Sequence, residues 1–206
     1  MEAGEAYAGF NFTHLYDLHG QEKLQFFFMH IRNEDTTGKL LNISLKYTQL
    51  QLGIATPLFL TDFDEYSYLC QSTWITHLWK YVSSSGLNID LTDSGIVATQ
   101  REYDDFIMDV LHNSPNFTKS EYIIANKARL ALNILHLSDI VDGSGRRLLP
   151  DVRNCVIHRR SKLNWPHQIF LPKWKPIWQK ACAVLQRYVS ANPLGLQLSK
   201  LNQELM

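Results

Sequence analysis

Basic and aromatic side chains alternate in one stretch of this chain, between residues 146 and 180. The cations of the stretch are Arg146, Arg147, Arg153, Arg159, Arg160, Lys162, Lys173, Lys175 and Lys180. Three tryptophans, Trp165, Trp174 and Trp178, stand among them. Cations that contact phosphates beside flat rings that stack on bases or sugars are what a nucleic-acid surface needs. The same pattern also fits a solvated basic face over a core anchored by tryptophan.

Charge is sorted along the chain, although the 206 residues carry a net charge of zero. Residues 1–105 contain 14 acidic and 6 basic side chains, which gives a net charge of −8. Residues 106–206 contain 6 acidic and 14 basic side chains, which gives +8. The basic half would steer a polyanion to one side of the protein and strengthen phosphate contacts there.

Paired acids at positions 104 and 105 resemble the aspartates that hold two metal ions in nucleotidyl transfer. Such sites have one residue between the aromatic side chain and the pair, whereas Tyr103 directly precedes Asp104 here. We therefore expect these acids to start a helix, where the helix dipole favours them. A metal-dependent nuclease that uses Asp104, Asp105 or Asp109 remains an alternative, and it requires these acids to converge in a cleft.

Other patterns for catalysis or metal binding are incomplete. Cys155, His158 and His167 lack a fourth zinc ligand at a suitable spacing, because Cys182 falls within an expected helix. The sequence contains neither a Gly-x-Ser-x-Gly string nor a glycine-rich phosphate loop that leads into a helix. The sequence thus predicts no catalytic residue, no metal and no cofactor, and it leaves the three cysteines as buried, reduced thiols.

The composition is that of a globular protein, with 45% hydrophobic and 12% aromatic residues. Polar residues interrupt every apolar run well before the roughly 20 residues that a membrane span requires. The acidic N-terminus has no basic and apolar regions of a secretory signal. These features predict an intracellular protein, cytoplasmic or nuclear, without a membrane partner.

Apolar spacing predicts a mostly α fold. The expected helices cover residues 22–32, 39–52, 72–82, 102–112, 118–135 and 174–189. Thr118 and Glu121 form the strongest start signal, a capping box. Residues 57–68 are expected to be a loop, and Asp142-Gly143-Ser144-Gly145 predicts a small β-hairpin over residues 137–149. We expect one helical domain over residues 20–190 with a basic C-terminal half, a mobile segment over 1–19 and a tail over 191–206.

Several strings occur in an order seen in polyproteins that retrotransposons encode. They are Leu40 to Gly53 (LLNISLKYTQLQLG), Ser72 to Trp79 (STWITHLW), Arg101 to Asp109 (REYDDFIMD), Asn126 to Leu132 (NKARLAL), Leu137 to Gly143 (LSDIVDG), and Trp165-Pro166-x-Gln168 followed by Trp174 and Trp178. On these strings, residues 20–182 resemble a region of retrotransposon reverse transcriptases outside the catalytic palm. Tyr103 stands where the family has Gly, and Ala128 and Ala131 stand where it has Cys and Tyr.

The resemblance implies an accessory helical domain without the catalytic motif of an RNA-directed DNA polymerase. Such a domain would hold RNA or DNA, with the reverse-transcriptase catalytic domain as a further partner. The residues that we expect at nucleic acid are Arg146, Arg147, Arg153, Arg159, Arg160, Lys162, Trp165, Lys173, Trp174 and Lys175. The alternative is an interaction scaffold in which the acidic and basic halves pair, within one chain or between two, and the tryptophans belong to the core.

Overall fold

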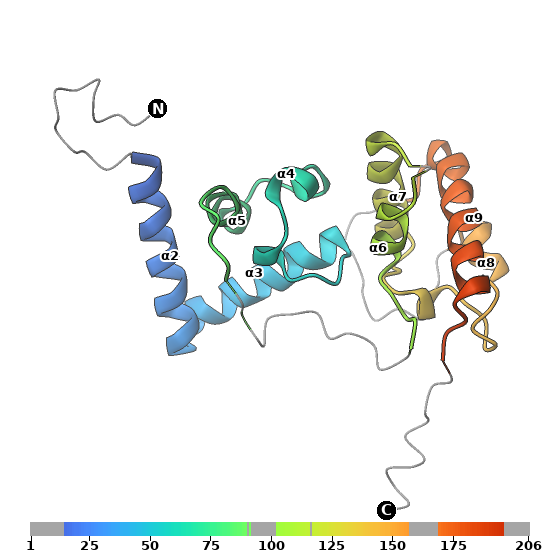
Figure 1. Cartoon of the computed structure of the whole chain (residues 1–206), viewed down its shortest axis with the longest axis horizontal. Coiled ribbons are helices and arrows are strands. Elements are labelled where there is room, and N and C mark those ends of the chain that lie inside the picture. Colours follow the sequence, from blue (N-terminus) through green and yellow to red (C-terminus); the bar gives the residue numbers. More distant parts are fainter. Residues whose placement is uncertain (1–14, 90, 92–101, 116, 157–168, 196–206) are drawn as a thin grey trace, which may run out of the picture. The chain divides into compact units, whose positions relative to one another are not determined.

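The computed structural model describes residues 15–89, 91, 102–115, 117–156 and 169–195 (Figure 1). Within these ranges the regular structure consists of eight α-helices and short 3-10 turns, which confirms the mostly helical class. No helix in the described ranges is long and apolar enough to cross a membrane. The chain divides into two compact units, residues 1–48 with 56–95 and residues 49–55 with 96–206.

The first unit is built around the packing of α2 (Leu15–Asn33) on α5 (Trp74–Ser84). Gly20 allows the close approach, because a Cβ at that position would lie 2.2 Å from the Tyr81 ring. Trp79 is fully buried, and its indole N–H donates to the Thr61 carbonyl at 2.9 Å. The unit therefore depends on a glycine that admits one aromatic ring and on a tryptophan that anchors the preceding segment.

Short helical turns fill the segment over residues 57–68, which the sequence predicts to be a loop. They are η1 (Leu58–Leu60), α4 (Phe63–Tyr66) and η2 (Ser67–Leu69). The side chain of Asp62 caps α4 by accepting from the Asp64 N–H at 2.7 Å. The helix expected over residues 72–82 is α5 (Trp74–Ser84), with Thr73 as its N-cap.

The second unit packs α9 (Lys175–Ala191) against α6 (Ile107–His112), α7 (Lys119–Ala131) and α8 (Pro150–Arg153). The side chains of Trp178 and Leu185 on α9 are fully buried. The predicted capping box of α7 is present, with Thr118 and Glu121 each accepting from the other's backbone N–H. Helix α3 (Thr36–Leu52) contributes its last residues to this unit.

Two predictions for the second unit are wrong in detail. The helix expected over residues 102–112 begins only at Ile107, because Tyr103 has a positive φ of 58° and Phe106 is extended. The β-hairpin expected over residues 137–149 is not seen, and Val141 and Leu148 form an isolated antiparallel bridge. A 3-10 turn (Leu137–Asp139) precedes this bridge and α8 begins at Pro150, so the flanking backbone is not free to extend into strands.

A fully buried arginine joins the end of α3 to the rest of the second unit. The Arg129 guanidinium donates to the carbonyls of Leu50 and Gln51 at 3.1 and 3.0 Å. It also donates to the Ile134 carbonyl at 3.2 Å and to the Asn126 side-chain oxygen at 2.7 Å. Burial lowers the pKa of Arg129 to about 10. The Asn126 amide also donates to the Gln51 carbonyl at 3.0 Å, so two side chains supply hydrogen bonds to carbonyls that lack partners within the helix.

Replacing Gly53 with alanine should destabilise the second unit by about 3 kcal/mol, from left-handed backbone strain and overpacking together. Gly53 has a φ of +68°, and a Cβ there would lie 2.6 Å from Cζ of Arg129. Urea unfolding of Gly53→Ala measures this loss. Gly143→Ala is the control, because nothing lies within 4 Å of its Cβ position. Equal midpoints for the two variants would contradict the proposed role of the Arg129 contact.

The ion pair between Glu121 and Lys180 should make stability depend on pH under acidic conditions. The hydrogen bonds from Lys180 and from the Thr118 backbone lower the pKa of Glu121 from 4.5 to about 2. The carboxylate therefore adds stability that is complete above pH 4.5 and is lost as the pH falls toward 2. We expect Glu121→Gln to lose this part of the pH dependence in urea unfolding. Asp151→Asn, at an exposed acid without an ion pair in the described ranges, should keep the wild-type slope.

Candidate nucleic-acid interface

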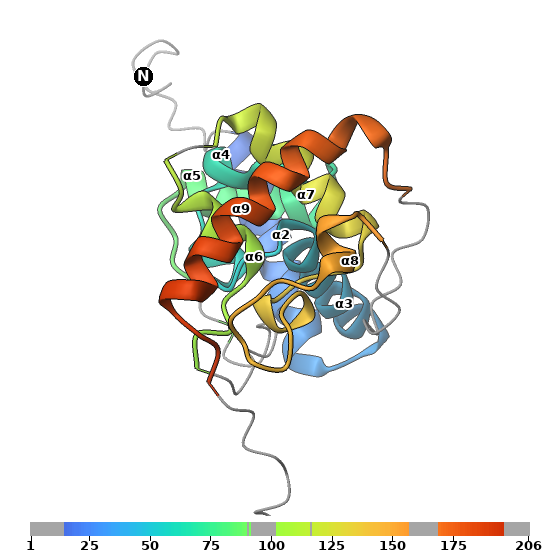
Figure 2. The same cartoon turned by 90° about the vertical axis from the view of Figure 1, so that its right-hand side faces the viewer.

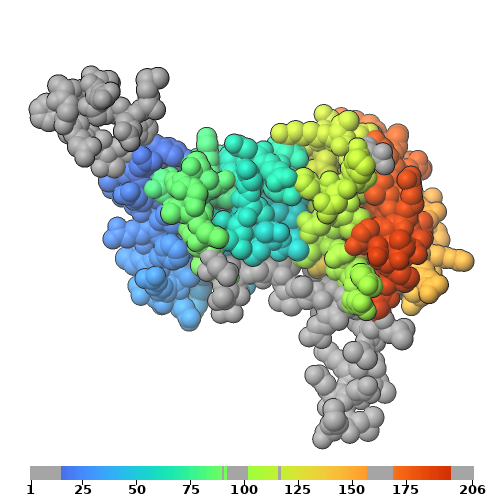
Figure 3. Space-filling view, in the orientation of Figure 1, coloured from blue at the N-terminus to red at the C-terminus, as the bar shows by residue number. Residues whose placement is uncertain are grey.

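Three of the arginines predicted at nucleic acid line one pocket of the second unit. This arginine pocket has a volume of about 630 Å³ and is lined by Arg146, Arg147, Leu148, Pro150, Arg153, Gln186 and Ser190. Figure 2 shows α8 and the segment before it beside α9, and Figure 3 shows the same elements at the surface of this unit. The residues that line the pocket include three arginines and no acidic residue, so its lining favours an anion.

Local backbone geometry brings the three arginines to the same place. The Asp142 carboxylate accepts from the N–H and hydroxyl of Ser144 at 3.1 and 2.5 Å and so holds a tight turn. Gly145 ends this turn with a φ of +68°. Arg146 and Arg147 follow directly, and Pro150 opens the short helix α8 that ends at Arg153. The turn therefore places Arg146 and Arg147 beside α9, and the helix α8 places Arg153 there.

The side chain of Gln186 on α9 organises this pocket through four hydrogen bonds. Its amide oxygen accepts from the Leu148 N–H at 3.0 Å and from the Arg153 guanidinium at 2.6 Å. Its amide nitrogen donates to the Arg146 carbonyl at 2.9 Å and to the Ser190 hydroxyl at 3.0 Å. One amide thus fixes the backbone of the turn and the head group of one arginine. Gln186 is not among the residues that the sequence predicts, because nothing in the chain near it marks this role.

A second pocket adjoins the arginine pocket. It has a volume of about 460 Å³ and is lined by Arg153, Asn154, Gln179, Cys182, Ala183 and Gln186. We call it the amide pocket, because three of its residues carry carboxamides. Arg153 and Gln186 line both pockets, so the two pockets adjoin at these side chains.

Two other members of the basic and aromatic stretch make structural contacts within the second unit. Trp178 is fully buried and donates its indole N–H to the Val152 carbonyl at 2.9 Å, so this tryptophan belongs to the core. Lys180 pairs with Glu121 at 2.7 Å and lies over the Phe117 ring at 5.1 Å. Neither side chain is therefore available to a ligand without the loss of a structural contact.

The remaining predicted residues fall into two groups. Lys173 and Lys175 are exposed and Trp174 is half-buried, at the turn where α9 begins. By the rise of an α-helix, Lys175 lies about 16 Å along the axis from Gln186. This group is thus separate from the arginine pocket. The other predicted residues, Arg159, Arg160, Lys162 and Trp165, lie outside the described ranges.

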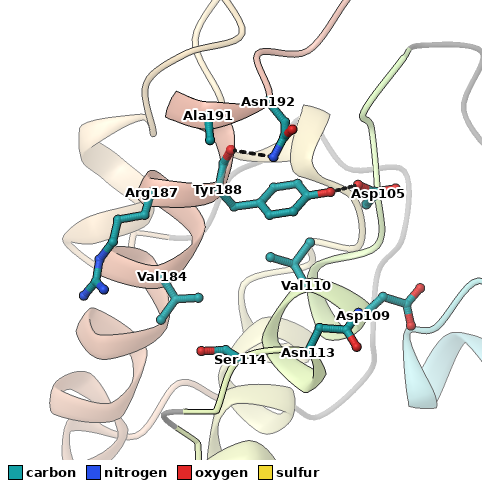
Figure 4. A pocket seen from close by; sticks show the side chains of 10 residues that line it. All are labelled: Asp105, Asp109, Val110, Asn113, Ser114, Val184, Arg187, Tyr188, Ala191 and Asn192. Carbon is teal, nitrogen blue, oxygen red and sulfur yellow. Dashed lines mark hydrogen bonds between the residues drawn. The ribbon is translucent and has the colours of Figure 1, made fainter.

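The aspartates of the nuclease alternative have different partners. Asp104 accepts from the Ser138 N–H at 2.7 Å, and Asp109 accepts from the Ala55 N–H at 2.9 Å. Asp105 accepts from the Tyr188 hydroxyl. Figure 4 shows Asp105 and Asp109 on the rim of a pocket of about 570 Å³, with the Asp109 carboxylate turned away from Asp105. Burial raises the pKa of Asp109, which weakens it further as a metal ligand.

No group of three or more His, Cys, Asp or Glu side chains in the described part of the chain could hold a metal ion. Cys182 is buried, and burial raises the pKa of its thiol to about 12, so it stays protonated. Cys70 and Cys155 are half-buried rather than buried, and burial raises the pKa of each thiol. His158 and His167 lie outside the described ranges.

Comparisons of the chain with protein families, with curated proteins and with solved structures find no match. The candidate site is therefore defined by its own geometry: an anion-attracting pocket of three arginines, held by one glutamine, beside a pocket of amides.

Replacing Gln186 with leucine should cost about 1 to 2 kcal/mol in urea unfolding, because the partners of its amide group lose their hydrogen bonds. Ser190→Ala is the matched control. It removes only one of the four partners, from an exposed residue on the same helix, and should change the free energy of unfolding by less than about 0.5 kcal/mol. A Gln186→Leu protein as stable as the control would show that the network does not hold the turn.

Proposed function

We propose that this chain is an accessory nucleic-acid-binding module of a retrotransposon reverse transcriptase, without catalytic activity of its own. The observation that carries the binding function is the convergence of Arg146, Arg147 and Arg153 on one pocket. Guanidinium groups match phosphate oxygens in geometry and charge, and they contact phosphates through pairs of parallel hydrogen bonds.

The charges of this pocket are available to a ligand. All three arginines are exposed, and none makes an ion pair with an acidic side chain of the described ranges. Where surface cations serve only stability or solubility, they are usually interspersed with acids. Three arginines around one concavity, in a half of the chain with a net charge of +8, instead form an anion site.

The group at the start of α9 extends this surface. Lys173 and Lys175 offer two further cations, and Trp174 offers a ring that is partly accessible for stacking. With about 16 Å between the two groups along the helix, a strand of several nucleotides would contact both. The ordered strings from Leu40 to Trp178 support the retrotransposon origin.

Binding of labelled single-stranded RNA, single-stranded DNA and a hybrid duplex, followed by fluorescence anisotropy across a salt series, tests the proposal. We expect affinity to fall linearly on a log–log salt plot. The triple variant Arg146→Ala, Arg147→Ala, Arg153→Ala should bind single strands more weakly and lower the slope by about 2, because each lost phosphate contact contributes about 0.7.

The control for this experiment removes three exposed cations elsewhere, Lys39, Lys80 and Lys127, and so changes the net charge equally. It should keep the wild-type slope. If both triple variants lose affinity equally, general charge rather than the arginine pocket drives binding. If the wild-type chain binds no nucleic acid at low salt and forms an oligomer that salt dissociates, the interaction scaffold is the better description.

A further inference from the structure

We call the arginine pocket and the amide pocket together the composite site. They share Arg153 and Gln186, and their volumes of about 630 and 460 Å³ are each in the range of small-ligand sites. One part presents guanidinium groups, and the other presents the carboxamides of Asn154 and Gln179. A ligand that fills both must therefore carry a strongly anionic end next to a polar group with both donors and acceptors.

The concentration of charge favours a phosphate monoester over an internal phosphodiester. A monoester carries a charge of about −1.5 to −2 near pH 7, whereas each internal phosphate of a strand carries −1. Three arginines that line one pocket carry enough donors for the three free oxygens of a monoester. Successive internal phosphates would instead be matched by cations that are spaced along the surface. Lys173 and Lys175 are spaced in this way from the arginine pocket.

The arginine pocket is also ordered before any ligand arrives. The hydrogen bond of 2.6 Å from Arg153 to Gln186 fixes one guanidinium, and the bond of 2.9 Å from Gln186 to the Arg146 carbonyl fixes the turn that carries the other two. A side chain that is already held, as Arg153 is, loses less conformational freedom on binding, so more of its electrostatic attraction appears as affinity. A fixed arrangement of donors suits a single terminal phosphate better than a phosphodiester backbone that can shift along the protein.

The amide pocket offers what a nucleoside attached to that phosphate would need. Carboxamides such as those of Asn154 and Gln179 pair with the edges of bases through one donor and one acceptor. Ala183 and the protonated thiol of Cys182 provide apolar surface beside them. Because this pocket adjoins the arginine pocket at Arg153, the base and the phosphate of a single nucleotide have separate places.

We infer that the composite site binds the terminal nucleotide of an RNA or DNA strand through a phosphate monoester at its end. This inference rests on the proposed function, because it names the part of the nucleic acid that the arginine pocket recognises. The group at the start of α9 then contacts phosphates further along the same strand.

The test compares oligonucleotides of one sequence that carry a phosphate at the 5′ end, a phosphate at the 3′ end, or hydroxyl groups at both ends. A fluorophore on an internal base reports binding by anisotropy. We expect one of the phosphorylated strands to bind about tenfold more tightly than the hydroxyl strand, the gain from charge-assisted hydrogen bonds to the terminal group. Equal affinities for all three strands would overturn the inference and leave the proposed function intact, whereas no binding of any strand would remove both.

Two variants separate the pocket from general electrostatics. Arg153→Ala should reduce the ratio between the phosphorylated and the hydroxyl strand to about one, because Arg153 belongs to both pockets. Lys175→Ala also removes one positive charge, but outside the composite site. It should weaken the binding of both strands and leave the ratio of their affinities unchanged. A ratio that survives Arg153→Ala would place the end preference elsewhere and overturn the assignment.

Competition distinguishes a strand end from a free nucleotide, since both carry the same phosphate monoester. Adenosine 5′-monophosphate and adenosine are titrated against the bound phosphorylated strand. If the monophosphate displaces the strand and adenosine does not, the site recognises the phosphate. Combined with tighter binding of a phosphorylated strand, this result supports the inference. If the monophosphate binds but the three strands have equal affinity, the site takes a free nucleotide, and the inference about strand ends is wrong.

Discussion

The second unit depends on a buried guanidinium that has only neutral partners. Arg129 is fully buried and gives its hydrogen bonds to the Leu50, Gln51 and Ile134 carbonyls and to the Asn126 side chain. A charge is costly to bury unless every donor is satisfied. The partial negative charge at the C-terminus of α3 offsets part of that cost. Gly53, with its positive φ and no side chain, leaves room for the guanidinium, so the turn after α3 and the arginine require each other.

A similar arrangement recurs at the surface. The Gln186 side chain makes hydrogen bonds to the backbone of the turn before α8, as the Arg129 side chain does to the backbone at the end of α3. Its amide bonds the backbone of Arg146 and Leu148 and the head group of Arg153. The difference lies in what remains unpaired. The donors of Arg129 are directed into the protein, whereas Arg146 and Arg147 keep their guanidinium groups exposed around a concavity. Stability and ligand attraction are therefore supplied by different arginines.

The basic and aromatic stretch illustrates how burial divides residues that look alike in sequence. Trp178 and Lys180 belong to the structure, through the Val152 carbonyl and the Glu121 carboxylate. Trp174 and Lys175, a few positions earlier, lie where α9 begins and keep accessible surface. The acids at positions 104, 105 and 109 are divided in the same way, because each accepts a hydrogen bond from a different partner. The sequence identifies which side chains could bind a ligand, and their packing in the fold determines which of them remain accessible.

Local signals in the sequence determined the helical class, the capping box at Thr118 and the position of the last helix to within two residues, because each depends on neighbours a few positions apart. They also placed the positive charge in the second half of the chain. They failed at residues 137–149, where the flanking turn and α8 prevent a hairpin, and they do not record the division into two units. Only the tertiary structure decided that Arg146, Arg147 and Arg153 share a pocket. Their convergence depends on hydrogen bonds between Gln186 and residues 33 to 40 positions away, and no local pattern records a contact of that range.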